Sequence, residues 1–326
     1  MKNRNGGEAM DPVTHGVIGL ALSAFSGNPV AVTNPISIGC ALGAMSPDID
    51  IVSKIHGDYV YLKHHRGISH SIPMLAGLSL VISAGLYFFF RDFSFLNIFF
   101  WTFIGASSHT LFDILNSYGA KLFMPFSKKK LTVGILMLYD PVITVLSLLL
   151  IFKRNLTAPF LFVISAIFFV YLGFRSWMKK KAEKYFMKHY EKQYRITKIH
   201  VLPALMAFHK WDAVITTEKH QLVVQINMIN KKIFERKRFQ KADQELINLF
   251  EETKIGKYIK EFTPSYHIMH IKEMEKVVLK CIDLRYFLRN NFMHHATAVF
   301  DHEKNIIESF FHPYNIHKNI RVVEYE

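Results

Sequence analysis

The sequence predicts a membrane α-helical bundle followed by a small soluble α+β domain with an antiparallel sheet. Four segments lack Asp, Glu, Lys and Arg, at residues 12–47, 67–90, 93–112 and 155–174. Uncharged apolar runs of about 20 residues can cross the hydrocarbon core of a bilayer. From Arg175 onward the chain is rich in charge. This change predicts a membrane-embedded domain over residues 1–175 and a cytoplasmic α+β domain over residues 176–326.

Composition supports this division and narrows the function classes. Of the 326 residues, 50% are hydrophobic, and the net charge is +14. Such a charge in a soluble protein would suggest nucleic-acid binding, but much of it flanks apolar runs, as in membrane proteins. We therefore expect no nucleic-acid partner. The two cysteines, Cys40 and Cys281, lie in different halves, which excludes a disulfide framework and a cysteine-based zinc module.

Six spans are expected in the first half. The first two are short and joined by Gly27-Asn28-Pro29, so a re-entrant hairpin is the alternative. The six are Val13 to Phe25, Val30 to Met45, Ile72 to Phe90, Phe95 to Phe112, Val133 to Phe152 and Leu156 to Phe174.

Positive charge predicts the orientation of these spans. Placing the basic residues 175–184 in the cytoplasm leaves only Arg91, Lys153 and Arg154 on the opposite face, as the positive-inside rule requires. We expect a multi-pass protein of the cell membrane with a cytoplasmic C-terminal domain.

Paired carboxylates follow the second span in Ser46-Pro47-Asp48-Ile49-Asp50. Pro47 disfavours helix at the preceding residue, and alternating Asp residues can supply oxygen ligands or a bridging carboxylate. The alternative is a helix cap or an Asx turn, in which Asp is also favoured.

The next loop is dense in imidazoles, in His64-His65-Arg66-Gly67-Ile68-Ser69-His70-Ser71. His65 and His70 can turn toward one ion, and Arg66 can hold an anionic oxygen. The alternative is a basic interface loop that contacts lipid headgroups.

His109 and Asp113 lie one helical turn apart at the end of the fourth span. This i, i+4 spacing places both side chains on one helix face, either as two ligands or as a ligand and its orienting carboxylate. A structural His-Asp hydrogen bond is the alternative. His15, at the start of the first span, is a candidate ligand or an interfacial histidine. All candidates fall at the cytoplasmic end of the predicted bundle, and Asp140 is expected somewhat deeper.

These motifs, together with Met10 to Gly16, resemble in their order the YdjM-like family of membrane-bound, predicted metal-dependent hydrolases. The resemblance covers about residues 10 to 175. It implies an inner-membrane protein with a metal hydrolase site, distantly similar to zinc-dependent phospholipase C and P1-type nucleases, which contain an HxxxD pair like His109 and Asp113.

We expect a membrane hydrolase acting on a phosphoester or lipid-headgroup substrate, since ionisable residues inside spans mark functional sites. Arg66 and Asp50 are the candidate catalytic residues, and zinc is the expected metal, with manganese or magnesium as alternatives. One alternative function is a non-enzymatic metal-binding protein that signals through its soluble domain, and another is an ion or proton transporter. Membrane lipid is the expected partner. The candidate metal ligands are His15, Asp48, Asp50, His65, His70, His109 and Asp113.

The soluble half shows alternating β-branched and aromatic residues at 194–207 and 211–238, then helical spacing at 241–262. Further strand-like runs at 266–271, 276–288, 293–301 and 306–311 predict an antiparallel sheet with one or two helices. Most histidines here lack ligand spacing and are expected to be structural. His294-His295 is the one pair in this half that we retain as a possible metal site.

Overall fold

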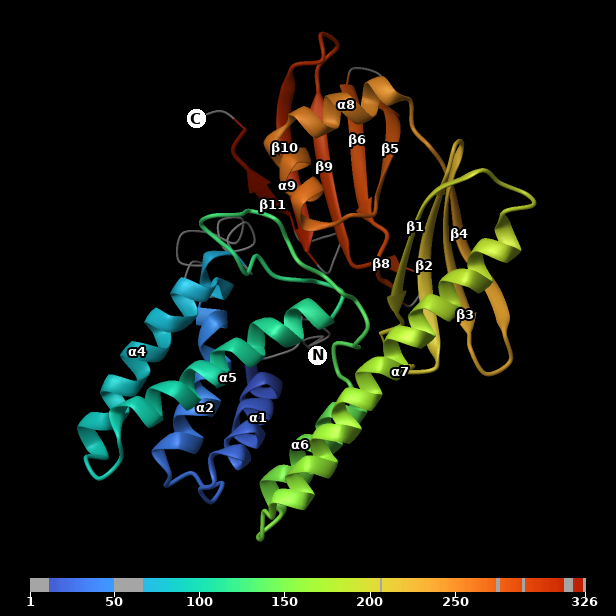
Figure 1. Ribbon diagram of the computed structural model, residues 1–326. Coiled ribbons are helices and arrows are strands. Elements are labelled where there is room, and N and C mark those ends of the chain that lie inside the picture. Colours follow the sequence, from blue (N-terminus) through green and yellow to red (C-terminus); the bar gives the residue numbers. More distant parts are fainter. Residues whose placement is uncertain are drawn as a thin grey trace, which may run out of the picture. The chain divides into compact units, whose positions relative to one another are not determined.

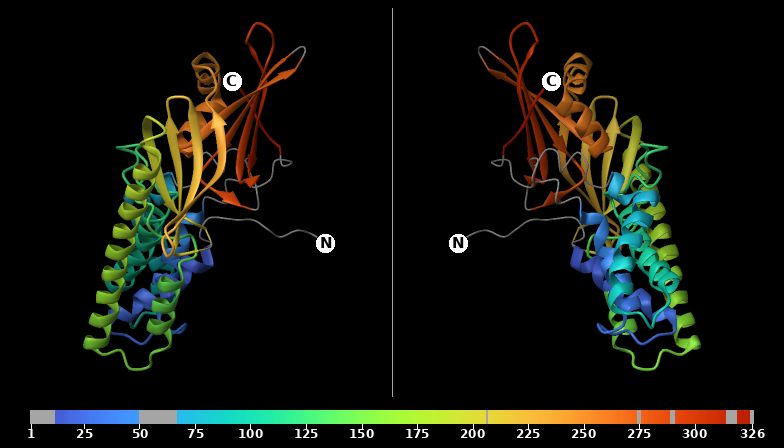
Figure 2. Two further views of the ribbon diagram at one scale, coloured as in Figure 1. Left: turned by 90° about the vertical axis from the view of Figure 1, so that its right-hand side faces the viewer. Right: turned by 90° about the vertical axis from the view of Figure 1, so that its left-hand side faces the viewer.

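The computed structural model describes residues 12–49, 67–205, 207–273, 276–288, 291–313 and 319–324. The chain divides into two compact units, and the boundary between them along the chain falls between Met178 and Lys179, within one long helix. Figure 1 and the turned views of Figure 2 show the helices and strands of both units. The predicted order of apolar helices followed by antiparallel sheets is confirmed.

The helical unit is built around α5. Its other elements are α1, the 3-10 turns η1 and η3, and the helices α2, α4, α6 and α7 (Figure 1). Their bounds are α1 Pro12–Leu22, η1 Ser23–Ser26, α2 Pro35–Met45, η3 Ile68–His70, α4 Ile72–Phe89, α5 Phe95–Leu115, α6 Pro141–Phe152 and α7 Ala158–Tyr190.

Three helices, α4, α5 and α7, are long and apolar enough to cross a membrane. Large apolar side chains on α4 and α7 face outward, with Val81 71% and Phe169 68% exposed. In water such a surface would be costly, whereas in lipid it is the expected one. Over α5, 56% of the apolar segment is buried, which makes α5 the central helix of the unit.

The remaining apolar helices are shorter than predicted. At 1.5 Å per residue, the 11 residues of α1 and of α2 span about 17 Å, well below the hydrocarbon thickness of about 30 Å. The hairpin alternative therefore describes α1 and α2 better than two full spans. The prediction of one span from Val133 to Phe152 is wrong, because α6 begins only at Pro141.

Asp140 and Arg175 have structural roles in the helical unit. The Asp140 carboxylate accepts hydrogen bonds from the backbone N–H groups of Val142 and Ile143 and from the Tyr171 hydroxyl. Arg175 is fully buried, and its Nε donates to the Ile135 carbonyl at 2.9 Å. The sequence placed Arg175 among the basic residues 175–184, and in the structure its guanidinium holds the irregular segment before α6.

The second unit contains two main antiparallel sheets. One has the order β1-β2-β3-β4 and the other the order β11-β10-β9-β6-β5, with β7 and β8 forming a short third sheet. The strands are β1 Ile196–Pro203, β2 Lys210–Thr217, β3 His220–Asn227, β4 Lys232–Gln240, β5 Tyr266–Glu273, β6 Lys276–Asp283, β7 Phe287–Leu288, β8 Asn291–Phe292, β9 His294–Phe300, β10 Ile306–Pro313 and β11 Ile320–Val322.

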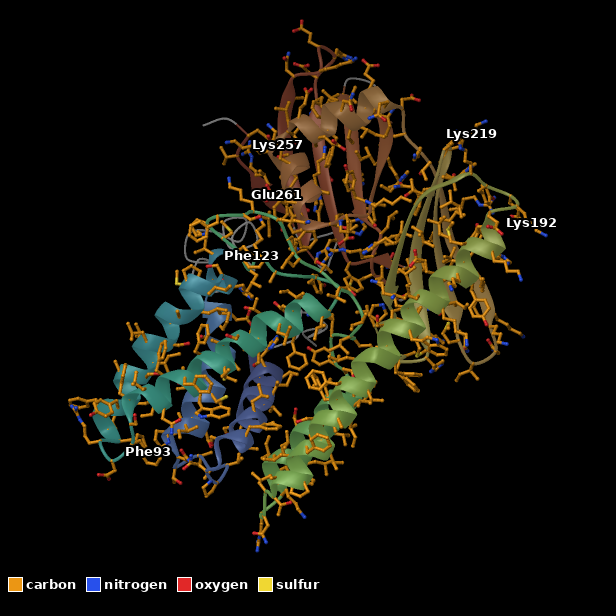
Figure 3. The ribbon with its side chains drawn as sticks, viewed as in Figure 1. Phe93, Phe123, Lys192, Lys219, Lys257 and Glu261 are labelled. Atoms are coloured by element: carbon orange, nitrogen blue, oxygen red, sulfur yellow. The ribbon has the colours of Figure 1, made fainter. Side chains whose placement is uncertain are left out.

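Helices complete this unit. The predicted helical segment 241–262 forms two helices, α8 Gln244–Glu252 and α9 Lys254–Phe262, separated by Thr253, whose hydroxyl caps α9. A shared core joins the sheets through Val214, Val223 and Ile282. Lysines lie on the outside, with Lys192 after α7 and Lys219 in the turn between β2 and β3 (Figure 3).

Candidate metal centre

Five of the predicted ligands converge at one end of the helical unit. They come from α1, the residues that follow α2, η3 and α5. His15, His70, His109 and Asp113 are at most 1% exposed, whereas the Asp48 side chain is 15% exposed. Asp48 is therefore the most accessible of the five. They form two overlapping groups, one of His15, His109 and Asp113 and the other of Asp48, His70 and His109.

Four potential ligand atoms lie at separations close to those of a metal site. The Nε2 atoms of His70 and His109 are 3.1 Å apart, and His70 Nε2 is 3.4 Å from Asp113 Oδ2. Asp48 Oδ1 is 3.5 Å from His109 Nε2 and 4.0 Å from His70 Nε2. His109 Nε2 lies 3.8 Å from Asp113 Oδ2.

These separations test whether a zinc ion fits. Zinc bonds of about 2.0–2.1 Å in tetrahedral geometry place ligand atoms about 3.3 Å apart. Five of the six separations among the four atoms run from 3.1 to 4.0 Å, which is close to this spacing. Two imidazoles and two carboxylates also match the ligand types that zinc prefers.

Glycine packing positions His109. A Cβ on Gly105 would overlap the Cys40 carbonyl, so only glycine allows α5 to lie this close to α2. One turn further along both helices, His109 Nδ1 lies 2.7 Å from the Ala44 carbonyl oxygen. This bond places the proton on Nδ1 and leaves Nε2 as the ligand atom, as in many metal-bound histidines.

Sequence reasoning did not identify two supporting side chains. Ser69 Oγ lies 2.9 Å from His70 Nδ1, and Asn116 Nδ2 donates to Asp113 Oδ1 at 3.0 Å. Such neighbours orient ligands and tune their affinity. Asn116 could have been found from its i+3 position after Asp113, whereas Ser69 had no distinguishing signal beyond adjacency to His70.

His15 occupies the far side of the cluster. Its ring stacks on His109 with centroids 3.7 Å apart, and its Nε2 is 3.8 Å from Asp113 Oδ1. The two oxygens of Asp113 therefore face different neighbours, since Oδ2 faces His70 and His109. This arrangement suits a carboxylate that bridges two ions, or one that holds an ion on one side and a histidine on the other.

Three other predicted site residues, Asp50, His65 and Arg66, lie outside the described residues. Asp140 was expected deeper in the same bundle, but it caps α6 and does not belong to either group of potential ligands.

Histidines of the second unit do not form a similar group among the described residues. His294 is buried, and burial lowers its pKa to about 4. His295 Nε2 lies 2.9 Å from the Phe292 carbonyl oxygen. Nearby, the buried Arg285 pairs with Asp283 at 2.7 Å. These contacts agree with the expected structural role of most histidines in this half.

Comparisons with known proteins match two separate parts of the chain. The family described as YdjM inner membrane protein matches residues 10–182, and the YfhP C-terminal alpha/beta plait domain matches residues 245–321. The uncharacterized protein YfhP of Bacillus subtilis (strain 168) is 37% identical over 140 residues, which cover 41% of this chain and 43% of that protein. No solved structure matches the chain.

The first family match covers more than half of the chain and includes all five clustered side chains. Together with the three apolar helices, it identifies a membrane protein. The chain belongs to the YdjM inner membrane protein family.

Proposed function

We propose that this protein is a membrane-bound, metal-dependent hydrolase that cleaves a phosphoester, most naturally in a lipid headgroup, at the cytoplasmic interface. The observation that carries the proposal is the convergence of five buried or partly buried His and Asp side chains from four separate segments. In support of an ion, two imidazole Nε2 atoms lie 3.1 Å apart with carboxylate oxygens around them.

In the proposal, Asp48, His70, His109 and Asp113 hold one divalent ion, with zinc preferred and manganese or magnesium as alternatives. A bound ion of this kind polarises a phosphoester and acidifies a water molecule. His109 contributes through Nε2 alone, because its Nδ1 bonds to Ala44. A second ion, if bound, would use His15 and Asp113 Oδ1, the two atoms on the far side of the cluster.

Asp48 provides the approach for substrate. Asp48 is the accessible ligand, so the substrate phosphoester would meet the centre there. Arg66 is proposed to stabilise the negative charge that develops on the phosphoryl oxygens, and Asp50 and His65 to complete the centre. We further propose that the protein crosses the membrane several times and that its C-terminal unit is cytoplasmic, as the distribution of basic residues predicts.

The test combines metal analysis with a substrate screen. Purified full-length protein is expected to contain at least one equivalent of a divalent metal and to hydrolyse a lipid phosphoester. His70→Ala and His109→Ala should each lose the metal and lower the rate of hydrolysis by more than about a hundredfold. Loss of an outer-shell partner alone lowers activity by up to about a hundredfold, and loss of a ligand should cost more. The matched control is His189→Ala, because His189 is exposed near the end of α7.

The outcomes separate the alternatives. Stoichiometric metal without turnover of any phosphoester would favour the non-enzymatic metal-binding function. Full hydrolysis by both folded histidine variants would refute the proposed site.

A further inference from the structure

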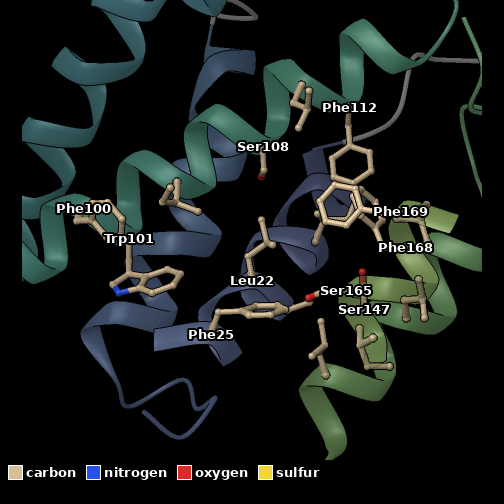
Figure 4. Close-up of a pocket in the computed structure, with 18 residues that line it drawn as sticks. Leu22, Phe25, Phe100, Trp101, Ser108, Phe112, Ser147, Ser165, Phe168 and Phe169 are labelled. Carbon is tan, nitrogen blue, oxygen red and sulfur yellow. The ribbon is translucent and has the colours of Figure 1, made fainter. Parts of the chain in front are cut away.

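A cavity of about 380 Å³ lies beside the metal centre within the helical unit. Its walls come from α1, α5, α6 and α7 (Figure 4). The lining is almost entirely apolar, with Leu22, Phe25, Trp101 and Phe168 among its side chains. A ligand in this cavity therefore gains stability from apolar burial and shape.

The few polar side chains of the lining are serines. The Ser108 hydroxyl donates to the Gly105 carbonyl, and the Ser165 hydroxyl donates to the Leu161 carbonyl. These two hydroxyl protons are used within their own helices, so Ser108 and Ser165 do not require a polar ligand. Ser147 is the third serine of the lining.

The cavity lining and the candidate metal ligands of α5 lie on adjacent faces of that helix. Ile104, Ser108 and Phe112 line the cavity. His109 directly follows Ser108, and Asp113 directly follows Phe112. Both of these residues belong to the candidate metal centre. Successive residues of a helix differ by about 100° in direction. The cavity and these two candidate ligands therefore lie on neighbouring faces of the same helix.

The cavity has the length of one lipid leaflet. Its lining on α5 runs from Phe100 to Phe112, and 12 steps of 1.5 Å give about 18 Å. Half of the hydrocarbon core is about 15 Å. Figure 4 shows Trp101 toward one end and Phe112 toward the other.

The size of the cavity suits an extended hydrocarbon chain. Its volume of about 380 Å³ corresponds to about a dozen groups of about 30 Å³ each, so an extended chain of roughly a dozen methylene groups fits this space.

We infer that this cavity binds an acyl chain of the substrate, so that the substrate is an amphiphile with its phosphoester at the metal centre and a chain along α5. The inference rests on the proposed hydrolase function. It adds that apolar recognition of the chain, rather than of the headgroup alone, contributes to substrate selection.

The first experiment measures chain binding without turnover. Full-length His70→Ala protein in detergent receives a trace of phospholipid with a photoreactive group on its acyl chain, and labelled residues are mapped by mass spectrometry. We expect labelling of residues 104–112 at least tenfold above that of residues 80–89, which lie on the outward-facing α4. Ile104→Trp and the milder Leu111→Trp should remove this excess, whereas Leu96→Trp should retain it, because Leu96 is an exposed α5 residue outside the cavity.

The second experiment measures substrate selection. Ile104→Trp should lower kcat/KM for a long-chain phosphoester at least tenfold more than for a water-soluble phosphoester, whereas Leu96→Trp, outside the cavity, should change neither. Equal labelling of α4 and α5, cross-linking to a partner protein in place of lipid, or equal losses on both substrates would overturn the inference. Excess labelling of residues 104–112 in a protein without hydrolysis would support chain binding and refute the hydrolase function.

Discussion

Replacing Gly105 with alanine should damage the metal centre without changing a ligand. The added Cβ would overlap the carbonyl carbon and oxygen of Cys40, both of which are backbone atoms that cannot rotate away. Relief of this overlap requires α2 and α5 to separate. Since ordinary contacts between carbon atoms begin near 3.5 Å, a separation of about 1 Å or more is needed.

That separation acts directly on His109. Its Nδ1 is 2.7 Å from the Ala44 carbonyl oxygen, and an additional 1 Å, to about 3.7 Å, would break this hydrogen bond. Loss of a partner that orients a metal-bound histidine lowers metal affinity by about 10–100-fold. We therefore expect Gly105→Ala to weaken metal binding by about this factor.

The matched control is Gly77→Ala on α4, where a Cβ meets no atom within 4 Å. Both changes gain about 1 kcal/mol of helix propensity, so the difference between the variants isolates the packing cost of about 1–3 kcal/mol. Unfolding in detergent and metal titration of both variants provide the assays. If Gly105→Ala matched Gly77→Ala in both measurements, the close approach of α2 and α5 would not position the site.

Two other predictions address the ligand shell and the second unit. Ser69→Ala should weaken metal binding about tenfold, because it removes the contact with the His70 ring. Ser71→Ala should leave metal binding unchanged, because the Ser71 hydroxyl bonds to a backbone carbonyl. Equal affinities of the two variants in a metal titration would contradict the orienting role of Ser69. Burial lowers the pKa of His200, His267 and His294 to about 4, from 6.5. The folded unit therefore binds fewer protons than the unfolded chain between pH 4 and 6.5, and its stability, complete above pH 6.5, falls as the pH drops through that window. Each neutral histidine contributes on the order of 3 kcal/mol at most to the free energy of unfolding. Hydrogen exchange of the full chain at pH 7 and pH 5 should show weaker protection of the strands that carry these histidines at pH 5. Unchanged protection would count against neutral buried histidines.

Helical periodicity was sufficient to predict part of the centre. The i, i+4 spacing of His109 and Asp113 requires that both lie on one face of α5 once that helix forms. Alternation of apolar and polar residues likewise predicted strands such as β2 and β3, which pair in antiparallel register through Val214 and Val223.

Apolar composition alone did not distinguish helix from irregular chain between residues 133 and 152. Asp140-Pro141 carried the necessary signal, because Asp is a favoured N-cap and Pro is favoured in the first helical turn. In the structure the Asp140 carboxylate caps α6 in this way. Arg175 illustrates a different limit, since only tertiary contacts reveal that its Nε bonds to a backbone carbonyl.

The distances within the centre depend on contacts that residue spacing does not encode. His70 and His109 are 39 positions apart, yet their Nε2 atoms lie 3.1 Å from each other. The close approach of α5 to α2 at Gly105 sets the position of His109 against Ala44, and the Thr110 hydroxyl, on the next residue of α5, bonds to the His70 backbone carbonyl. A ligand set can thus be proposed from residue types and helix ends, but its convergence requires small residues at helix crossings. For that reason Gly105 is as informative a target for mutagenesis as the ligands themselves.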